Sequence, residues 1–190
     1  MRAEARREQI LDITHGIVDS EGFHAATVGR IAGEAGVTRA VLYQQFGDLA
    51  GLFVALIDRE SARAAAQYLE ATEAADSGDG PFVGTFAGVL RAVDAHPATW
   101  RLFLLPPEGA PPELHRRLAE SQEAVRHSLV ERLRTVLPGL PDAEYAARMV
   151  QAAGRELLQL RLTDPESATP ERILNAIRQV ADATRSWSRR

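Results

Sequence analysis

The chain has 190 residues, of which 45% are hydrophobic and 25% charged, as in folded globular proteins rather than disordered ones. The absence of cysteine excludes disulfides, thiolate metal sites and a cysteine nucleophile. The net charge is -4, and the first 50 residues hold five arginines against seven acidic residues, which is not the balance expected of a nucleic-acid binder.

Apolar residues recur at spacings of three and four, and alternating strand patterns are missing, so we expect an all-α fold. The first predicted helix carries Ile10, Ile13 and Ile17 and ends near Gly22. Proline, glycine and capping residues separate about nine helices in all. After the first, we expect helices over residues 28–35, 39–46, 48–75 and 82–95, a short one opened by Pro97, and further ones over residues 113–137, 142–162 and 170–187.

The second and third predicted helices form a helix-turn-helix over residues 27–46. Gly36 lies between them and supplies the positive φ that a tight turn between helices needs. Thr27 and Thr38 stand at the two N-cap positions. The second helix of such a motif enters the DNA major groove, where arginine suits guanine and glutamine suits adenine. The side chains that this arrangement leaves facing outward are Arg39, Ala40, Gln44 and Gln45.

Residues 8–56 resemble the tetracycline-repressor-like (TetR) family of bacterial regulators. The ordered markers are Glu21-Gly22-Phe23, Thr27-Val28, Ile31-Ala32, Ala35-Gly36-Val37, Leu42-Tyr43, Phe46 and Leu52-Phe53. The resemblance implies a helix-turn-helix DNA-binding domain of three helices over residues 1–47. It also implies a larger helical domain over residues 48–190 that binds a ligand and dimerises.

The resemblance implies a role for each DNA-facing residue. Thr27 and Thr38 would contact phosphate from the starts of their helices, and Tyr43 would direct its hydroxyl to phosphate. The residues that would face the bases or the groove edge are Arg39, Ala40, Gln44 and Gln45. Val41 would touch a thymine methyl group or simply pack. Leu49 departs from the family, which often has a phosphate-binding lysine at this position.

The larger domain is predicted to hold the effector and the dimer interface. In the family, apolar residues of the middle helices often line a cavity that suits a small hydrophobic or amphipathic ligand. The residues implied here are Phe86, Leu90, Trp100, Phe103 and Leu104, for each of which simple core packing is the alternative. The last two helices carry small and apolar stripes, so the resemblance implies a homodimer through a four-helix bundle. The stripe residues are Ala146, Ala147, Val150, Ala153, Gly154 and Leu157 in one helix and Ile173, Leu174, Ile177, Val180 and Ala181 in the other.

Other spacings are interpreted as structural. Glu21 and His24, and Asp12 and His15, resemble acid–histidine pairs, but a di-iron bundle needs further carboxylates on facing helices. We expect no enzyme activity, catalytic residue, metal or cofactor. Arg2, Arg6 and Arg7 are interpreted as a frayed terminus or, alternatively, as a minor-groove arm.

The amino terminus lacks an apolar segment of signal-peptide length, and no run of about 20 apolar residues could span a bilayer, so we expect a cytoplasmic protein without a membrane partner. The function implied is a transcription regulator, most simply a repressor, that binds a pseudo-palindromic operator as a dimer and is released by its effector. Repressor and activator are not separated by the sequence. The alternative, motivated by Leu49 and the acidic charge, is a helical small-molecule-binding protein with a weak or vestigial DNA-binding module.

Overall fold

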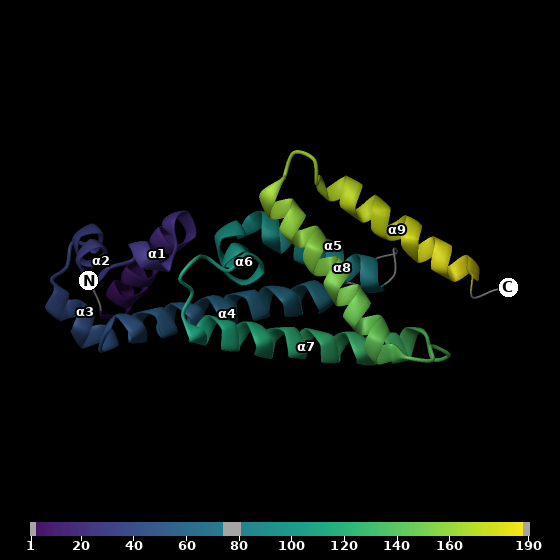
Figure 1. Cartoon of the computed structure of the whole chain (residues 1–190), viewed down its shortest axis with the longest axis horizontal. Helices are drawn as coiled ribbons and strands as arrows, with labels where there is room; N and C mark the ends of the chain where they lie inside the picture. The colour runs from purple at the N-terminus through teal and green to yellow at the C-terminus, as the bar shows by residue number, and fades with distance from the viewer. Residues whose placement is uncertain (1–2, 74–80, 188–190) are drawn as a thin grey trace. The chain divides into compact units, whose positions relative to one another are not determined.

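The computed structural model describes residues 3–73 and 81–187. Within these residues the chain forms nine α-helices, one 3-10 helix and no strand, so the all-α prediction is confirmed (Figure 1). The elements are α1 (Ala3–Glu21), η1 (Phe23–Ala25), α2 (Val28–Ala35), α3 (Arg39–Phe46), α4 (Leu49–Glu73), α5 (Pro81–Ala95), α6 (Pro97–Leu104), α7 (Pro112–Val136), α8 (Ala143–Thr163) and α9 (Pro170–Trp187).

The limits of α2 and α3 coincide with those predicted, because both helices begin at a capping threonine and end at a glycine. The sequence did not predict η1, a single 3-10 turn that follows Gly22. Its Phe23 is buried, and the Phe23 ring meets the Phe53 ring edge-on at a centroid distance of 5.0 Å. The break predicted over residues 76–81 lies outside the described residues except at its last position, where α5 begins at Pro81.

Contacts between Cα atoms divide the chain into two compact units. The first unit consists of the residues up to Arg63 together with Ala98–Gln122, and the second consists of Ala64–Pro97 together with the residues from Glu123 onward. Each unit therefore combines segments far apart in the sequence. The predicted functional boundary after residue 47 stays a prediction.

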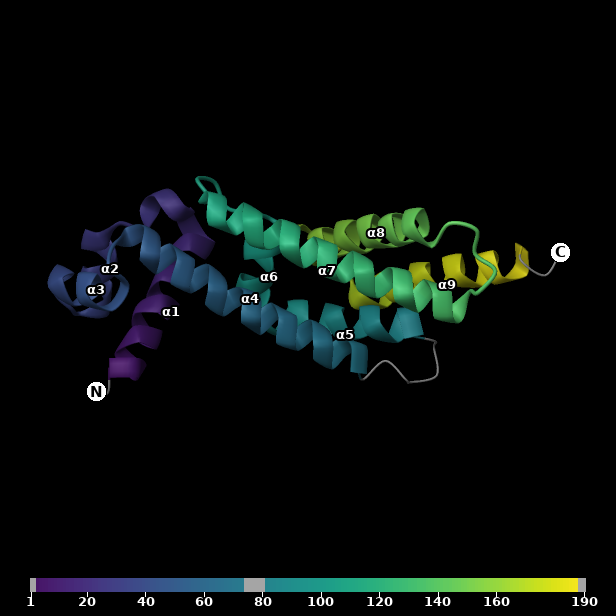
Figure 2. The same ribbon diagram turned by 90° about the horizontal axis from the view of Figure 1, so that it is seen from below.

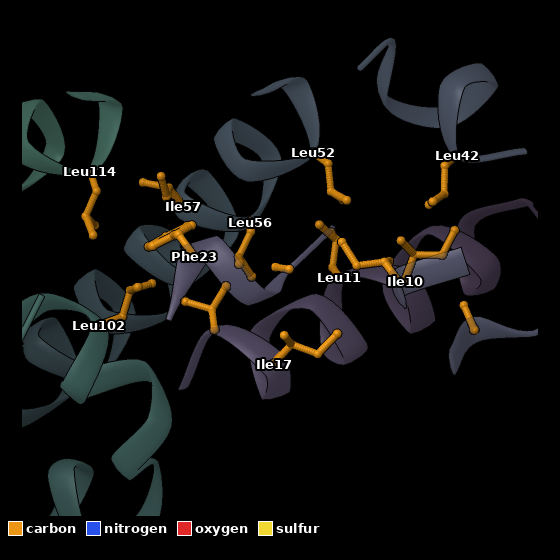
Figure 3. Packing of buried hydrophobic residues seen from close by; sticks show 14 of the residues in the cluster. Ile10, Leu11, Ile17, Phe23, Leu42, Leu52, Leu56, Ile57, Leu102 and Leu114 are labelled. Atoms are coloured by element: carbon orange, nitrogen blue, oxygen red, sulfur yellow. The ribbon is translucent and has the colours of Figure 1, made fainter. Parts of the chain in front are cut away.

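The first unit is built around one apolar core. Its helices α1, α2 and α3 gather around the first turns of α4 (Figures 1 and 2). Leu42 and Leu52 contribute to this core next to the α1 side chains (Figure 3). Leu102 of α6 and Leu114 of α7 extend the same core near Phe23. Segments from well beyond residue 47 thus complete the packing of the three amino-terminal helices.

A buried carboxylate ties three helices of the first unit together. Glu60 of α4 has no exposed surface, and its Oε2 accepts a hydrogen bond of 2.6 Å from the Thr99 hydroxyl on α6. Its Oε1 accepts from Arg63 Nη1 at 3.0 Å and lies 2.9 Å from Arg59 Nη2. His15 Nδ1 of α1 is 3.6 Å away. Because a buried charge is costly unless it is paired, this set of partners fixes α1, α4 and α6 in register.

In the second unit, α8 and α9 both pack against α5. Val130 and Leu133 of α7 form a small core with Ala143 and Ala147 of α8. Asp142 accepts a hydrogen bond of 3.0 Å from the Tyr145 backbone N–H and so caps the start of α8.

Among the described residues, no single helix is long and apolar enough to span a membrane. The pair α3 and α4, bent by 59°, passes the same test of length and composition only when the two helices are joined.

Candidate nucleic-acid interface

Two capped helices and one glycine set the geometry of the helix-turn-helix. Thr27 Oγ1 accepts a hydrogen bond of 3.3 Å from the Arg30 backbone N–H, and Thr38 Oγ1 accepts one of 3.4 Å from the Val41 backbone N–H. Gly36 ends α2 in the left-handed region with φ 62°, as the sequence predicted. These caps fix where α3 begins and therefore which of its side chains face outward.

The outer face of α3 carries most of the residues predicted to contact DNA. Leu42 points into the core and is 4% exposed, whereas Tyr43 on the other side is 50% exposed. The predicted contact residues that are exposed are Thr27, Thr38, Arg39, Ala40, Tyr43 and Gln44, and those that are half-buried are Val41 and Gln45. Their individual roles toward phosphate or bases stay predictions.

Tyr43 is partly packed against its neighbours and partly exposed. Its ring borders, with Phe46 and Leu49, a cavity of about 10 Å³, which holds at most one water molecule. Half of the residue nevertheless remains exposed. Leu49, at the family's lysine position, is half-buried and packs against the core, so this position offers no cation to a phosphate.

Arg7 of α1 contacts the end of α3, although the two lie far apart in the sequence. Its Nη1 donates a hydrogen bond of 2.8 Å to the Gln45 carbonyl oxygen, and its guanidinium lies 4.4 Å from the centre of the Phe46 ring. A cation at the carboxyl end of α3 is favourable because helix carbonyls there carry partial negative charge. Arg7 therefore belongs to a folded helix rather than a frayed terminus, whereas Arg2 lies outside the described residues.

Arg30 on α2 is neutralised by two carboxylates. Its Nη2 lies 2.6 Å from Glu21 Oε1, and its Nε lies 2.9 Å from Glu34 Oε1. The hydrogen bond with Glu21 raises the pKa of Arg30 and lowers the pKa of Glu21. By contrast, within the described residues the Arg39 side chain forms no hydrogen bond or ion pair, which leaves its charge available on the outer face.

The acidic residues of the suspected acid–histidine pairs are bound by arginines instead. Glu21 pairs with Arg30, and Asp12 Oδ1 accepts a hydrogen bond of 2.8 Å from Arg59 Nη1. In the part of the chain that the structure describes, no group of three or more histidine or acidic residues could hold a metal ion. Glu21 and Asp12 therefore form ion pairs that link α1 to neighbouring helices.

The five predicted effector residues are divided between the two units. Phe86 and Leu90 belong to α5 in the second unit, where Leu90 is buried and the half-buried Phe86 lies beside Gly154 of α8. Trp100, Phe103 and Leu104 belong to α6 in the first unit. Of these, Phe103 packs against the first unit's core. That these residues line an effector cavity stays a prediction.

The last two helices bear an exposed apolar stripe. On α8, Tyr145 is 70% and Met149 72% exposed, and Leu160 lies on the same helix face at 41%. Val180 of α9 is 65% exposed. Two positions of the predicted stripes lie inside the second unit instead, because Ala147 is fully buried and Ile173 is 4% exposed. Helical spacing alone did not distinguish the inner face of α8 from the outer one.

Comparison with known proteins agrees with the helix-turn-helix assignment. Residues 10–56 match the family described as bacterial regulatory proteins, tetR family. This match spans α1 from Ile10 onward, α2, α3 and the first turns of α4. It confirms the resemblance found in the amino-terminal sequence.

Solved structures resemble nearly the whole chain. A proposed transcriptional regulator from Pseudomonas aeruginosa PAO1 is 22% identical, with a TM-score of 0.74 over 98% of this chain and 93% of that one. A TetR-like transcriptional regulator from Rhodococcus sp. RHA1 is 24% identical, with a TM-score of 0.69 over 95% of this chain and 98% of that one. The transcriptional regulator FadR from Bacillus subtilis, in complex with stearoyl-CoA, is 16% identical, with a TM-score of 0.69 over 91% and 96%. At these identities the comparisons establish the fold.

Proposed function

Because residues 10–56 carry the TetR amino-terminal domain and the chain has the fold of TetR-family transcriptional regulators, we propose that it is a cytoplasmic repressor that binds a pseudo-palindromic operator as a homodimer and is released by a small hydrophobic effector. The observation that carries this proposal is the exposed outer face of α3, on which Arg39, Tyr43 and Gln44 stand free of the core.

The residues on this face have two proposed roles, since some position the protein on the DNA and others read the bases. Thr27, Thr38 and Tyr43 offer hydroxyl groups to phosphate, which fixes the module on the duplex without selecting sequence. Arg39 reads guanine and Gln44 reads adenine, since their planar groups form paired hydrogen bonds with these bases in the major groove. Arg30 contributes little net charge, because two carboxylates already bind it. Binding should therefore depend only weakly on salt concentration.

A repressor of this kind needs two arrangements of its recognition helices. The effector lowers operator affinity only to the extent that it binds the released arrangement more tightly than the DNA-bound one. The likeness in fold to a regulator solved with stearoyl-CoA favours an effector with a long apolar chain. The apolar residues proposed to receive it are Phe86, Leu90, Trp100, Phe103 and Leu104.

Fluorescence anisotropy with the intergenic DNA upstream of the gene tests the proposal. Wild type should bind with sequence preference, and Arg39→Ala and Gln44→Ala should each weaken binding roughly tenfold or more, because one paired contact to a base is lost. Arg134→Ala is the matched control, since it removes one exposed arginine from the part of α7 that belongs to the second unit. Unchanged affinity and preference in both α3 variants would refute the assignment of readout to α3.

A further inference from the structure

Gly29, the second residue of α2, lies directly against the side chain of Arg39, the first residue of α3. A Cβ atom built on Gly29 would stand 3.1 Å from Arg39 Nη2, 3.9 Å from its Cζ and 4.0 Å from its Nε. A side chain at position 29 would therefore press on the guanidinium, which would have to shift to relieve the contact. Both residues are exposed, so this contact lies on the outer surface of the helix-turn-helix.

The missing side chain of Gly29, rather than an ion pair, makes room for the guanidinium in this place. Within residues 3–73 and 81–187, the Arg39 side chain makes no hydrogen bond or ion pair, whereas the side chain of Arg30, which follows Gly29 in α2, is held by Glu21 and Glu34. The first turn of a helix also carries partial positive charge, which does not favour a cation. The place of the Arg39 guanidinium against α2 is therefore sensitive to any side chain at position 29.

We infer that Gly29 is a specificity-determining residue of the DNA interface, because it sets the direction in which Arg39 reaches toward the operator. This inference rests on the proposed function. Arginine selects guanine through two hydrogen bonds to O6 and N7, a geometry sensitive to where the planar group is held. A side chain at position 29 would move the guanidinium and change the base pair, or the strength of preference, that it reads.

We expect an alanine at position 29 to displace the Arg39 side chain rather than the α2 backbone. The atom closest to the added Cβ is the far end of a flexible side chain, and α2 itself has room at its exposed face. Gly29→Ala should therefore fold as well as wild type, helped by alanine's better helix propensity. Gly33→Ala is the matched control, because a Cβ on Gly33, also exposed and on the same helix, meets nothing within 4 Å.

Selection of binding sites from a randomised duplex library, followed by sequencing, tests the inference with purified full-length protein. Gly33→Ala should keep the wild-type preferences. Gly29→Ala should change the preference at the base pairs where Arg39→Ala removes it, by about tenfold or more, and leave the others unchanged. The double variant Gly29→Ala/Arg39→Ala should match Arg39→Ala alone, since no guanidinium remains to be displaced.

The remaining outcomes contradict either this inference or the proposal on which it rests. Wild-type preferences in Gly29→Ala at the Arg39-dependent positions would overturn the inference while leaving the proposed function intact. A thermal midpoint of Gly29→Ala well below that of Gly33→Ala would also overturn it, since the helix would then have yielded instead of the arginine. If wild type enriched no sequence at all, the proposed function itself would fail, and the inference with it.

Discussion

Gly51 is the residue on which the turn between α3 and α4 depends. A Cβ atom built there would overlap the carbonyl oxygen of Phe46, which is backbone and cannot swing aside. The Gly51 N–H also donates a hydrogen bond of 2.7 Å to the Asp48 carboxylate, which caps α4. The turn from α3 to α4 therefore depends on the small size of this residue.

We expect Gly51→Ala to lower the free energy of unfolding by about 1–3 kcal/mol, because the added methyl group must push α3 away from α4. Urea unfolding monitored by circular dichroism measures the change. Gly33→Ala is the control and should be neutral or stabilising, since its methyl group meets open space and alanine favours the helix. Equal stability of the two variants would show that the α3–α4 junction has more freedom than its geometry indicates.

At the scale of helices, sequence reasoning succeeded where the signals are local. Thr27, Gly36 and Thr38 act on their own turns, and the limits of α2 and α3 follow from them. It failed where partners are distant, as for Arg7, which reaches a carbonyl 38 residues away. No spacing rule connects such positions, because the fold alone brings them together. The same applies to Ala147, whose helical face is buried by α7 rather than by a partner.

Residues far apart in the sequence also fix the positions of α1, α4 and α6 relative to one another, through the buried carboxylate of Glu60. We expect Glu60→Ala to lower the free energy of unfolding by about 1–3 kcal/mol, because it leaves the buried Thr99 hydroxyl without an acceptor, although Arg59 keeps Glu8 and Asp12 as counter-charges. Arg59, whose side chain is 11% exposed, would lose its buried partner, and the Thr99 hydroxyl would lose its acceptor. Thermal and urea unfolding measure the effect.

The control for this variant is Glu131→Ala, which breaks the exposed pair with Arg134. Exposed pairs contribute little to stability, so its unfolding curve should nearly match that of wild type. If Glu60→Ala unfolded like Glu131→Ala, the buried cluster would not hold the three helices together.

At the scale of the whole molecule, the exposed stripe of α8 predicts the state of assembly. Large apolar side chains rarely stay in water as a contiguous patch on a monomer. We expect Met149→Glu to convert a wild-type dimer into a monomer, because it places a charge in the centre of this stripe. Light scattering coupled to size exclusion at micromolar concentration gives the mass directly.

Leu69→Glu provides the matched control, since Leu69 of α4 is 58% exposed but lies outside α8 and α9. This variant should remain a dimer. A monomeric wild type would contradict the proposed dimer. Dimers in both variants would place the interface outside the α8 stripe. Either result would remove the support that α8 gives to a two-fold operator.

The central claim is that two copies of α3 read a two-fold symmetric DNA site. Site selection from genomic fragments, followed by hydroxyl-radical footprinting on the enriched sequence, tests it most directly. We expect an inverted repeat with two protected half-sites whose centres lie about one helical turn, or a whole number of turns, apart. Enrichment of no sequence, or protection of a single half-site by a dimer, would contradict the account.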